Sequence, residues 1–168
     1  NSGLTKFVVP QYLAKIGDAA FYSSKITKLS FPATLSEVGT SAFANCLNLT
    51  FIEGLSNTKI TEIKSQTFYN CLNLDKVYLP STTTVIGDSA FANCSRLINL
   101  TIGSSLENIK ANAFLGCAAL TSIEFPETLK QIETKAFDSC SKLTIITFKH
   151  ADMSNIDVAA SVFDGTTS

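Results

Sequence analysis

The sequence has little of what most enzyme active sites require. It contains one histidine, His150, one arginine, Arg96, and no tryptophan. It has no glycine-rich phosphate loop, no G-x-S-x-G elbow and no H-E-x-x-H motif, and no second histidine with which to build an acid–base site. Asp18 and Asp88 each follow a glycine at one repeat phase, which favours a corner role over a catalytic one. We therefore expect a protein that is not an enzyme and has no cofactor.

Excess charge and long apolar runs are also missing. Lysine and arginine total 13, aspartate and glutamate total 14, and the formal net charge is −1. Phosphate binding needs a concentrated basic surface, so this balance argues against a nucleic-acid partner. No apolar run approaches the roughly 20 residues of a membrane-spanning helix. We expect neither nucleic-acid binding nor a membrane span in this chain.

What the chain does have is one pattern written about seven times. A phenylalanine, most often preceded by alanine, recurs at spacings of 22, 25, 23, 23, 23 and 26 residues. These positions are Phe21, Phe43, Phe68, Phe91, Phe114, Phe137 and Phe163. A sustained period near 23 is typical of a solenoid, in which each repeat stacks on its neighbours. We expect one elongated domain over residues 1–168 with about seven coils and a continuous aromatic spine.

The cleanest copy, Leu120 to Ser141, reads L-x-x-I-x-F-P-x-x-L-x-x-I-x-x-x-A-F-x-x-C-x-x. Its I-x-F pair has the alternation of a strand with one buried face, so each repeat, including the first around Phe7, is expected to contribute a short strand. All four prolines directly follow this strand and would end it. The strand-ending prolines are Pro10, Pro32, Pro80 and Pro126.

A second apolar pair follows this corner in the repeats, with one weak position at Thr83. Gly17, Gly39 and Gly87 come directly after this pair. We expect them at corners, with φ values that other residues resist. Extra residues at 54–59 and 149–154 should be absorbed in loops.

Five cysteines share one phase, three residues after the phenylalanine, and the first coil lacks this cysteine. They are Cys46, Cys71, Cys94, Cys117 and Cys140. Stacked coils would make them parallel neighbours about 4.8 Å apart, but parallel Cβ vectors do not meet disulfide geometry. A zinc site needs four converging ligands, and a catalytic thiol needs a nearby base, so we favour free buried thiols over both. Asn45, Asn70 and Asn93, each before a cysteine, suit a turn.

Copies such as LTSIEFPETLKQIETKAFDSC and LDKVYLPSTTTVIGDSAFANC resemble the BspA-like, or Treponema pallidum-type, leucine-rich repeats over residues 4 to 165. The resemblance implies an α/β leucine-rich-repeat horseshoe or solenoid, with a parallel concave sheet and a convex side that is mostly irregular, short-helical or short-stranded. It also implies a secreted or cell-surface protein that adheres to host, matrix or other cell-surface proteins. Departures occur around Gly54 and Gly103, at the missing first cysteine and in the last coil.

The chain carries no secretory signal. It also lacks the atypical polar cap that usually closes a repeat array. We therefore expect a monomeric fragment of a longer protein, in which residues 149–168 form a degenerate last coil or a cap. The degenerate coil is favoured because Val158 and Phe163 keep the five-residue spacing of the other repeats.

Function should lie on the outward positions that flank the central apolar residue of each strand. Aromatic and long basic residues, which favour interface anchors, gather there in the N-terminal half. We define the strand-face patch as Lys28, Phe51, Glu53, Lys76 and Tyr78, continued by Asn99 and Thr101. Three alternatives stay open: ordinary strand residues chosen for β-propensity and solubility, a structural spacer that displays another domain, and carbohydrate stacking on Phe51 and Tyr78.

Overall fold

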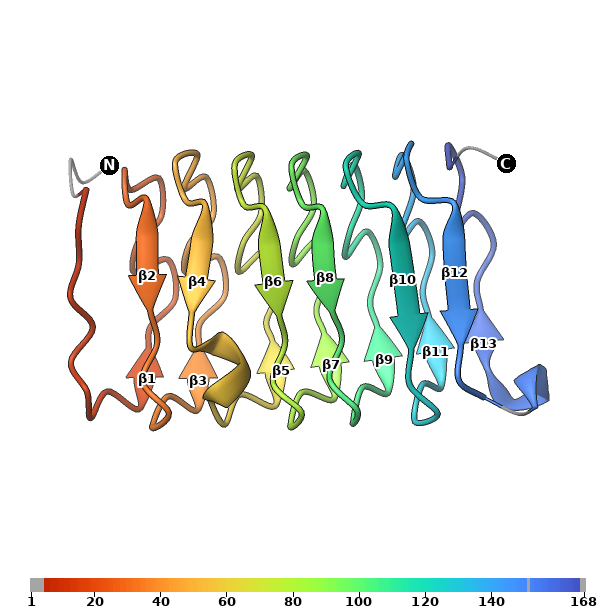
Figure 1. Cartoon of the computed structure of the whole chain (residues 1–168), viewed down its shortest axis with the longest axis horizontal. Coiled ribbons are helices and arrows are strands. Elements are labelled where there is room, and N and C mark those ends of the chain that lie inside the picture. The colour runs from red at the N-terminus through yellow and green to blue at the C-terminus, as the bar shows by residue number, and fades with distance from the viewer. Residues whose placement is uncertain (1–4, 151, 167–168) are drawn as a thin grey trace.

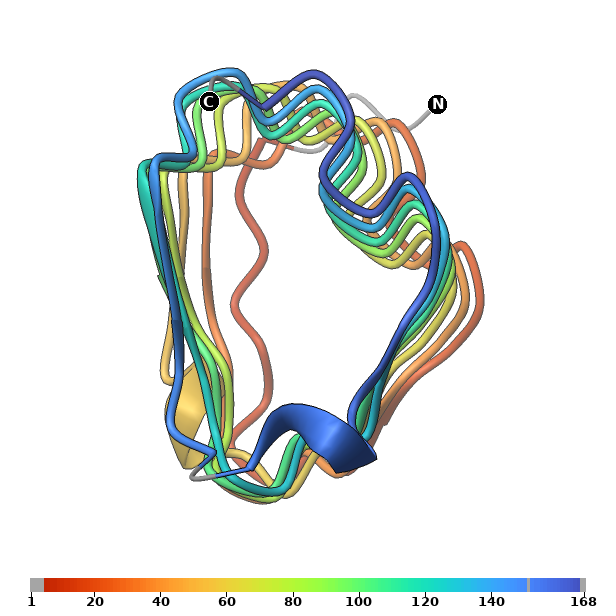
Figure 2. The same cartoon turned by 90° about the vertical axis from the view of Figure 1, so that its right-hand side faces the viewer.

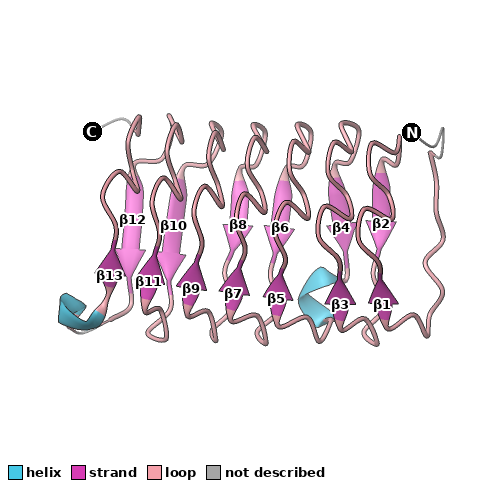
Figure 3. Ribbon diagram, turned by 180° about the vertical axis from the view of Figure 1, so that it is seen from behind, coloured by secondary structure: helices cyan, strands magenta, loops and turns pink. Residues whose placement is uncertain are grey.

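The chain winds into a solenoid whose coils place strands on two opposite faces (Figures 1 and 3). The computed structural model describes residues 5–150 and 152–166, so the first repeat position expected at Leu4 lies outside the described residues. One face, the long-strand face, carries strands of three or four residues. These are β2 (Lys28–Ser30), β4 (Phe51–Glu53), β6 (Lys76–Tyr78), β8 (Asn99–Thr101), β10 (Ser122–Phe125) and β12 (Ile145–Phe148).

The opposite face, the short-strand face, carries two-residue strands. These are β1 (Lys15–Ile16), β3 (Glu37–Val38), β5 (Glu62–Ile63), β7 (Val85–Ile86), β9 (Asn108–Ile109), β11 (Gln131–Ile132) and β13 (Asp157–Val158). Every strand pairing is parallel, between the same phase of successive coils. Viewed along the stack, the coils nearly superpose (Figure 2). The expected leucine-rich-repeat solenoid is therefore confirmed.

Two single-turn 3₁₀ helices mark the positions where the repeat is lengthened. Helix η1 (Leu55–Asn57) lies within the first stretch expected to absorb extra residues, and helix η2 (Met153–Asn155) begins in the second and ends one residue beyond it. Between β3 and β5, which η1 separates in sequence, the short-strand ladder is interrupted, and the long-strand ladder is interrupted between β8 and β10. The first interruption is bridged by the amide of Lys59, which donates to the Leu35 carbonyl oxygen at 2.8 Å.

The core is a column of phenylalanine rings that runs along the stack. Successive rings from Phe21 to Phe163 stack with centroid separations of 5.1 to 5.6 Å and interplanar angles of at most 17°. The offset-stacked range for aromatic pairs is about 4.5–7 Å, and such pairs add about 0.5–1.5 kcal/mol to their area burial. The expected aromatic spine is confirmed, and it joins the coils into one continuous core.

Each coil turns its corner around the phenylalanine with residues in the left-handed region. Positions two before and two after the ring have positive φ in nearly every coil. The expected turn residues Asn45, Asn70 and Asn93 have φ values of 60°, 58° and 62°, so that prediction is confirmed. Asparagine tolerates this region better than most residues.

The prediction that Gly17, Gly39 and Gly87 use positive φ is wrong, because none of them adopts it. Glycine is required at two of the three by a close approach of neighbouring backbone. A Cβ atom on Gly39 would lie 2.4 Å from the Asp18 backbone nitrogen, and one on Gly87 would lie 2.7 Å from the Ser65 backbone nitrogen. A Cβ atom on Gly17 would meet nothing within 4 Å.

All five cysteines are buried, free thiols, as predicted. Each Sγ atom donates to the carbonyl oxygen of the phenylalanine one coil earlier, at 3.1 to 3.3 Å. In the first coil Ser24 occupies the cysteine phase, and its hydroxyl lies 3.3 Å from Cys46 Sγ. Thr83, the weak apolar position, is fully buried and donates to the Ile60 carbonyl oxygen at 3.1 Å. Both polar side chains are thus satisfied inside the core.

The ends of the stack differ from the middle. The strand expected around Phe7 is not formed, because residues 5–10 have no regular structure and no backbone hydrogen bond joins them to β2. At the other end, β13 pairs with β11, and Phe163 stacks on Phe137 at 5.6 Å. The described part of 149–168 thus contains a coil in register with the others.

Candidate functional site

The strand-face patch forms two neighbouring rows on β2, β4, β6 and β8. Parallel register puts Lys28 opposite Phe51, Phe51 opposite Lys76, and Lys76 opposite Asn99. The second row lies two residues farther along the strands and contains Glu53, Tyr78 and Thr101. Each row follows from strand alternation, because the buried residue between the rows points into the core. The structure therefore brings all seven residues onto one surface.

The side chains of the strand-face patch are available to a partner. Six of the seven are exposed, and Phe51 is half-buried between its lysine neighbours. Tyr78 keeps 40% of its surface exposed although it lies mid-sheet. Phe51 between two lysines, with Tyr78 on the adjacent strand, combines apolar contact area with positive charge, which is the chemistry of protein interface anchors.

Ion pairs are more numerous on the short-strand face than on the long-strand face among the described residues. Four ion pairs lie on or beside the short-strand face and link adjacent coils. They are Lys15–Glu37 at 2.8 Å, Lys64–Glu37 at 2.6 Å, Lys110–Glu133 at 2.7 Å and Lys130–Glu107 at 2.9 Å. On the long-strand side, Lys149 pairs with Glu124 at 2.6 Å. Among residues 5–150 and 152–166, no ion pair includes Lys28, Glu53 or Lys76.

Glu37 forms a clamp across the interruption between β3 and β5. Its carboxylate accepts hydrogen bonds from Lys15 and Lys64, which lower the pKa of Glu37 from its ordinary value of 4.5 to about 2. The same contact raises the pKa of Lys64, and Glu133 raises the pKa of Lys110 in the same way. Most lysines and glutamates on this face thus hold coils together, whereas Lys28, Glu53 and Lys76 of the strand-face patch have no ion pair among the described residues.

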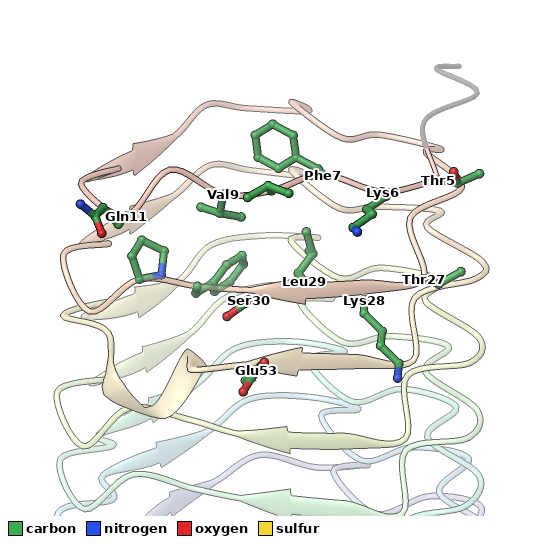
Figure 4. A pocket seen from close by; sticks show the side chains of 13 residues that line it. Thr5, Lys6, Phe7, Val9, Gln11, Thr27, Lys28, Leu29, Ser30 and Glu53 are labelled. Atoms are coloured by element: carbon green, nitrogen blue, oxygen red, sulfur yellow. The ribbon is translucent and has the colours of Figure 1, made fainter.

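An apolar groove adjoins the patch at its N-terminal side (Figure 4). It lies between residues 5–9 and β2 and has a volume of about 620 Å³. Phe7, Val9, Leu29 and Phe31 supply its apolar walls. Sequence reasoning missed this groove, because the repeat pattern around Phe7 predicts a paired strand where the structure leaves the segment unpaired. The pair Val8-Val9 before Pro10 matches the strand ends before Pro32, Pro80 and Pro126 and does not indicate the difference.

The cysteine thiols are poorly suited to catalysis. Burial raises the pKa of Cys71, Cys94 and Cys117 well above the ordinary thiol value, and raises that of Cys140 to about 12. These thiols stay protonated at neutral pH and are poor nucleophiles. In the described ranges, no three His, Cys, Asp or Glu side chains gather as metal ligands would. Nor does the described part of the chain hold a helix with the length and hydropathy of a membrane span.

A model of the BspA type leucine-rich repeat region matches residues 1–117 and 61–167, with six copies. A Treponema pallidum leucine-rich repeat protein is 25% identical with a TM-score of 0.84, over 94% of this chain and 74% of that one. A leucine-rich repeat protein from Eubacterium ventriosum is 27% identical with a TM-score of 0.76, over 84% and 38%. A leucine rich cell surface protein from Faecalibacterium prausnitzii, 21% identical with a TM-score of 0.57 over 95% and 56%, shares the fold. The chain thus spans less than two thirds of the latter two proteins. No curated protein matches the chain.

Proposed function

Because this chain belongs to the BspA-type leucine-rich repeat family, we propose that it is a non-enzymatic protein-binding module that adheres through its strand-face patch. Its place would be at the cell surface or outside the cell, as the family resemblance implies. The partner would be a host, matrix or cell-surface protein, bound by a monomeric solenoid.

One observation supports the patch above the rest of the surface. Seven lysines and glutamates on or beside the short-strand face pair with one another across adjacent coils, whereas Lys28, Glu53 and Lys76 have no ion pair among the described residues. A partner can therefore pair with these charges without breaking contacts that hold the coils together. Unpaired charge steers association and sets specificity more than it adds affinity.

The aromatic residues would supply the affinity. Phe51 and Tyr78 lie on adjacent strands, and Lys28 on β2 and Lys76 on β6 flank Phe51. Aromatic side chains buried at the centre of an interface are typical hot spots, whose truncation costs about 2 kcal/mol or more. The partner surface expected here is apolar at its centre, with acidic groups opposite Lys28 and Lys76.

Binding to a panel of purified matrix and cell-surface proteins tests this function. A variant with Lys28, Phe51, Lys76 and Tyr78 all changed to alanine should bind at least about thirtyfold more weakly, because it loses two aromatic anchors. The matched control changes Tyr12, Lys59, Leu72 and Lys142 to alanine, which are all exposed and lie off the patch. Equal affinity of both variants and the unchanged protein would remove the patch from the account.

A spacer role is the second candidate, and the unbroken aromatic column favours it, since stacked coils joined in this way resist bending. A spacer acts through its length. Deleting one whole coil, residues 91–113, should then impair the intact protein while the panel shows no ligand for the chain. A ligand whose binding depends on the strand-face patch would contradict the spacer role.

A further inference from the structure

We propose that the groove between residues 5–9 and β2 binds an extended peptide segment of the partner protein. The segment would add as a strand to the open edge of β2, with alternate apolar side chains in the groove and an acidic residue beside Lys6 and Lys28. This inference rests on the proposed function, because the groove adjoins the strand-face patch and shares Lys28 and Glu53 with it.

Strand β2 has an unpaired edge on the side of residues 5–10. Within the β2–β4 pair, the Phe31 amide donates to the Glu53 carbonyl oxygen at 2.8 Å. Backbone groups alternate sides along a parallel strand, so those of Lys28 and Ser30 point away from β4, toward residues 5–10. No backbone hydrogen bond reaches them from that segment. An extended peptide is the ligand that satisfies such a row of donors and acceptors.

The walls beside this edge are apolar. Phe7 and Val9 line one side, and Leu29 and Phe31 line the side of β2 (Figure 4). The volume of about 620 Å³ lies within the range of ligand pockets, about 300–1,000 Å³. Side chains at alternate positions of a strand reach the same side, so a peptide with apolar residues at every second position matches these walls.

The other interruption of the long-strand ladder shows that an open edge is not sufficient. Beside β8 and β10 the hollow is about 310 Å³, and its lining includes Ser104, Glu127 and Thr128. Glu124 and Lys149 also line it, and they form an ion pair with each other at 2.6 Å. The one lysine of that hollow is thus already paired, and Ser104, Glu127 and Thr128 make its wall more polar than that of the groove beside β2. Only the groove beside β2 combines an open edge, apolar walls and unpaired charge among the described residues.

Two lysines give one end of the groove a positive charge. Lys6 and Lys28 lie at the same end of the groove, beside Thr5 and Thr27, and Gln11 lies at the opposite end (Figure 4). Neither lysine has an ion pair within the described ranges. A single carboxylate on the peptide would complement both lysines at this end of the groove, whereas Glu53, which also lines the groove, would oppose a second one. The occupant is therefore an acidic, alternately apolar strand.

Selection from a displayed library of random heptapeptides, followed by fluorescence anisotropy with the enriched peptide, tests this proposal. The expected consensus has apolar residues at alternate positions and one Asp or Glu. Ser30→Pro removes one edge amide and should weaken binding about tenfold, whereas Ser30→Ala keeps that amide and should bind within about twofold. The double variant Lys6→Gln and Lys28→Gln should reduce the preference for the acidic peptide over its amide analogue about fivefold.

The peptide itself provides a second readout if Ser30→Pro folds poorly. N-methylation of alternate peptide amides removes backbone donors without changing the protein, and one of the two alternating sets should abolish binding. No enrichment, a consensus without alternation, or full tolerance of N-methylation in both sets would overturn the inference. If the partner still depends on Lys76 and Tyr78 while these results are negative, the proposed function stands and the groove fails. If that dependence is also absent, both fail.

Discussion

The Sγ atom of Cys71 lies 3.2 Å from the carbonyl oxygen of Phe43 and donates to it across adjacent coils. The same contact recurs at every cysteine. The thiol thus fills a core position next to the aromatic column and also supplies a weak donor where the backbone turns. Cysteine at this phase is accounted for by packing and hydrogen bonding between coils, without redox or metal chemistry.

Substitution of Cys71 should follow from this contact. Cys71→Ala loses the donor and leaves a cavity, so we expect it to lower the free energy of unfolding by about 1–2 kcal/mol. Cys71→Ser keeps a donor, as Ser24 does at the same phase of the first coil, and should cost less. Urea denaturation of both variants measures the difference. An alanine variant as stable as the serine variant would show that the hydrogen bond contributes nothing.

The thiols should be unreactive in the folded protein. Burial raises the pKa of Cys71, Cys94 and Cys117 well above its ordinary value, so thiolate should be scarce even at pH 9. Titration with a chromogenic disulfide should find no fast-reacting thiol before denaturation and five afterwards, without added reductant. Fewer than five after denaturation would mean that some cysteines are oxidised, contrary to the account.

Glu37 should make stability depend on acid pH. The pKa of its carboxyl is about 2 in the folded protein and has an ordinary value of 4.5, so the folded state binds the proton less readily than the unfolded chain. The stabilisation is complete above the ordinary value and is lost as pH falls toward 2. Glu37→Gln should therefore lower Tm at neutral pH, and the difference from the unchanged protein should shrink on acidification.

Glu62→Gln is the matched control for this pH effect, because Glu62 lies on β5 on the same face and has no ion pair among the described residues. Its Tm difference from the unchanged protein should vary little over the same range. A pH dependence as large as that of Glu37→Gln would mean that general charge on this face, and not the lysine clamp, controls the acid response.

Two glycines at the same repeat phase should respond oppositely to alanine. Gly39→Ala would place a methyl group 2.4 Å from the Asp18 backbone nitrogen, and we expect a loss of about 1–3 kcal/mol from overpacking. Gly17→Ala meets nothing within 4 Å and should be neutral or stabilise by up to about 1 kcal/mol through the unfolded state. Thermal unfolding of the two variants checks the pair. Equal losses would contradict the close-approach explanation.

The repeat pattern predicted the features that every coil shares. Phe43 and its counterparts recur at one phase, so their stacking followed from the period, and Asn45 was recognised as a turn residue by its position before the cysteine. The role of Gly39 could not be predicted from the repeat pattern. A glycine that recurs at one position of the repeat can serve either a positive φ or a close contact with a neighbouring coil. The distance of 2.4 Å from a Cβ atom on Gly39 to the Asp18 backbone nitrogen distinguishes the two roles, and only the structure provides it.

The features that vary between coils were the hardest to predict. Residues 5–10 have the sequence of a strand but lie unpaired. The outward positions of the strand-face patch were predictable from alternation. Which lysines and glutamates form ion pairs was not predictable from the sequence. Lys15, Glu37 and Lys64, for example, are brought together from three coils.

Photo-crosslinking from the strand-face patch shows whether a bound partner lies on this surface. A benzoylphenylalanine introduced at position 78 replaces one exposed aromatic ring with another, and position 108 on the short-strand face serves as the control site. With a ligand recovered from the protein panel, the account predicts crosslinks from position 78 and none from position 108, each mapped by mass spectrometry. Crosslinks from position 108 alone would place the interface on the face whose charges are already paired, and would contradict the account.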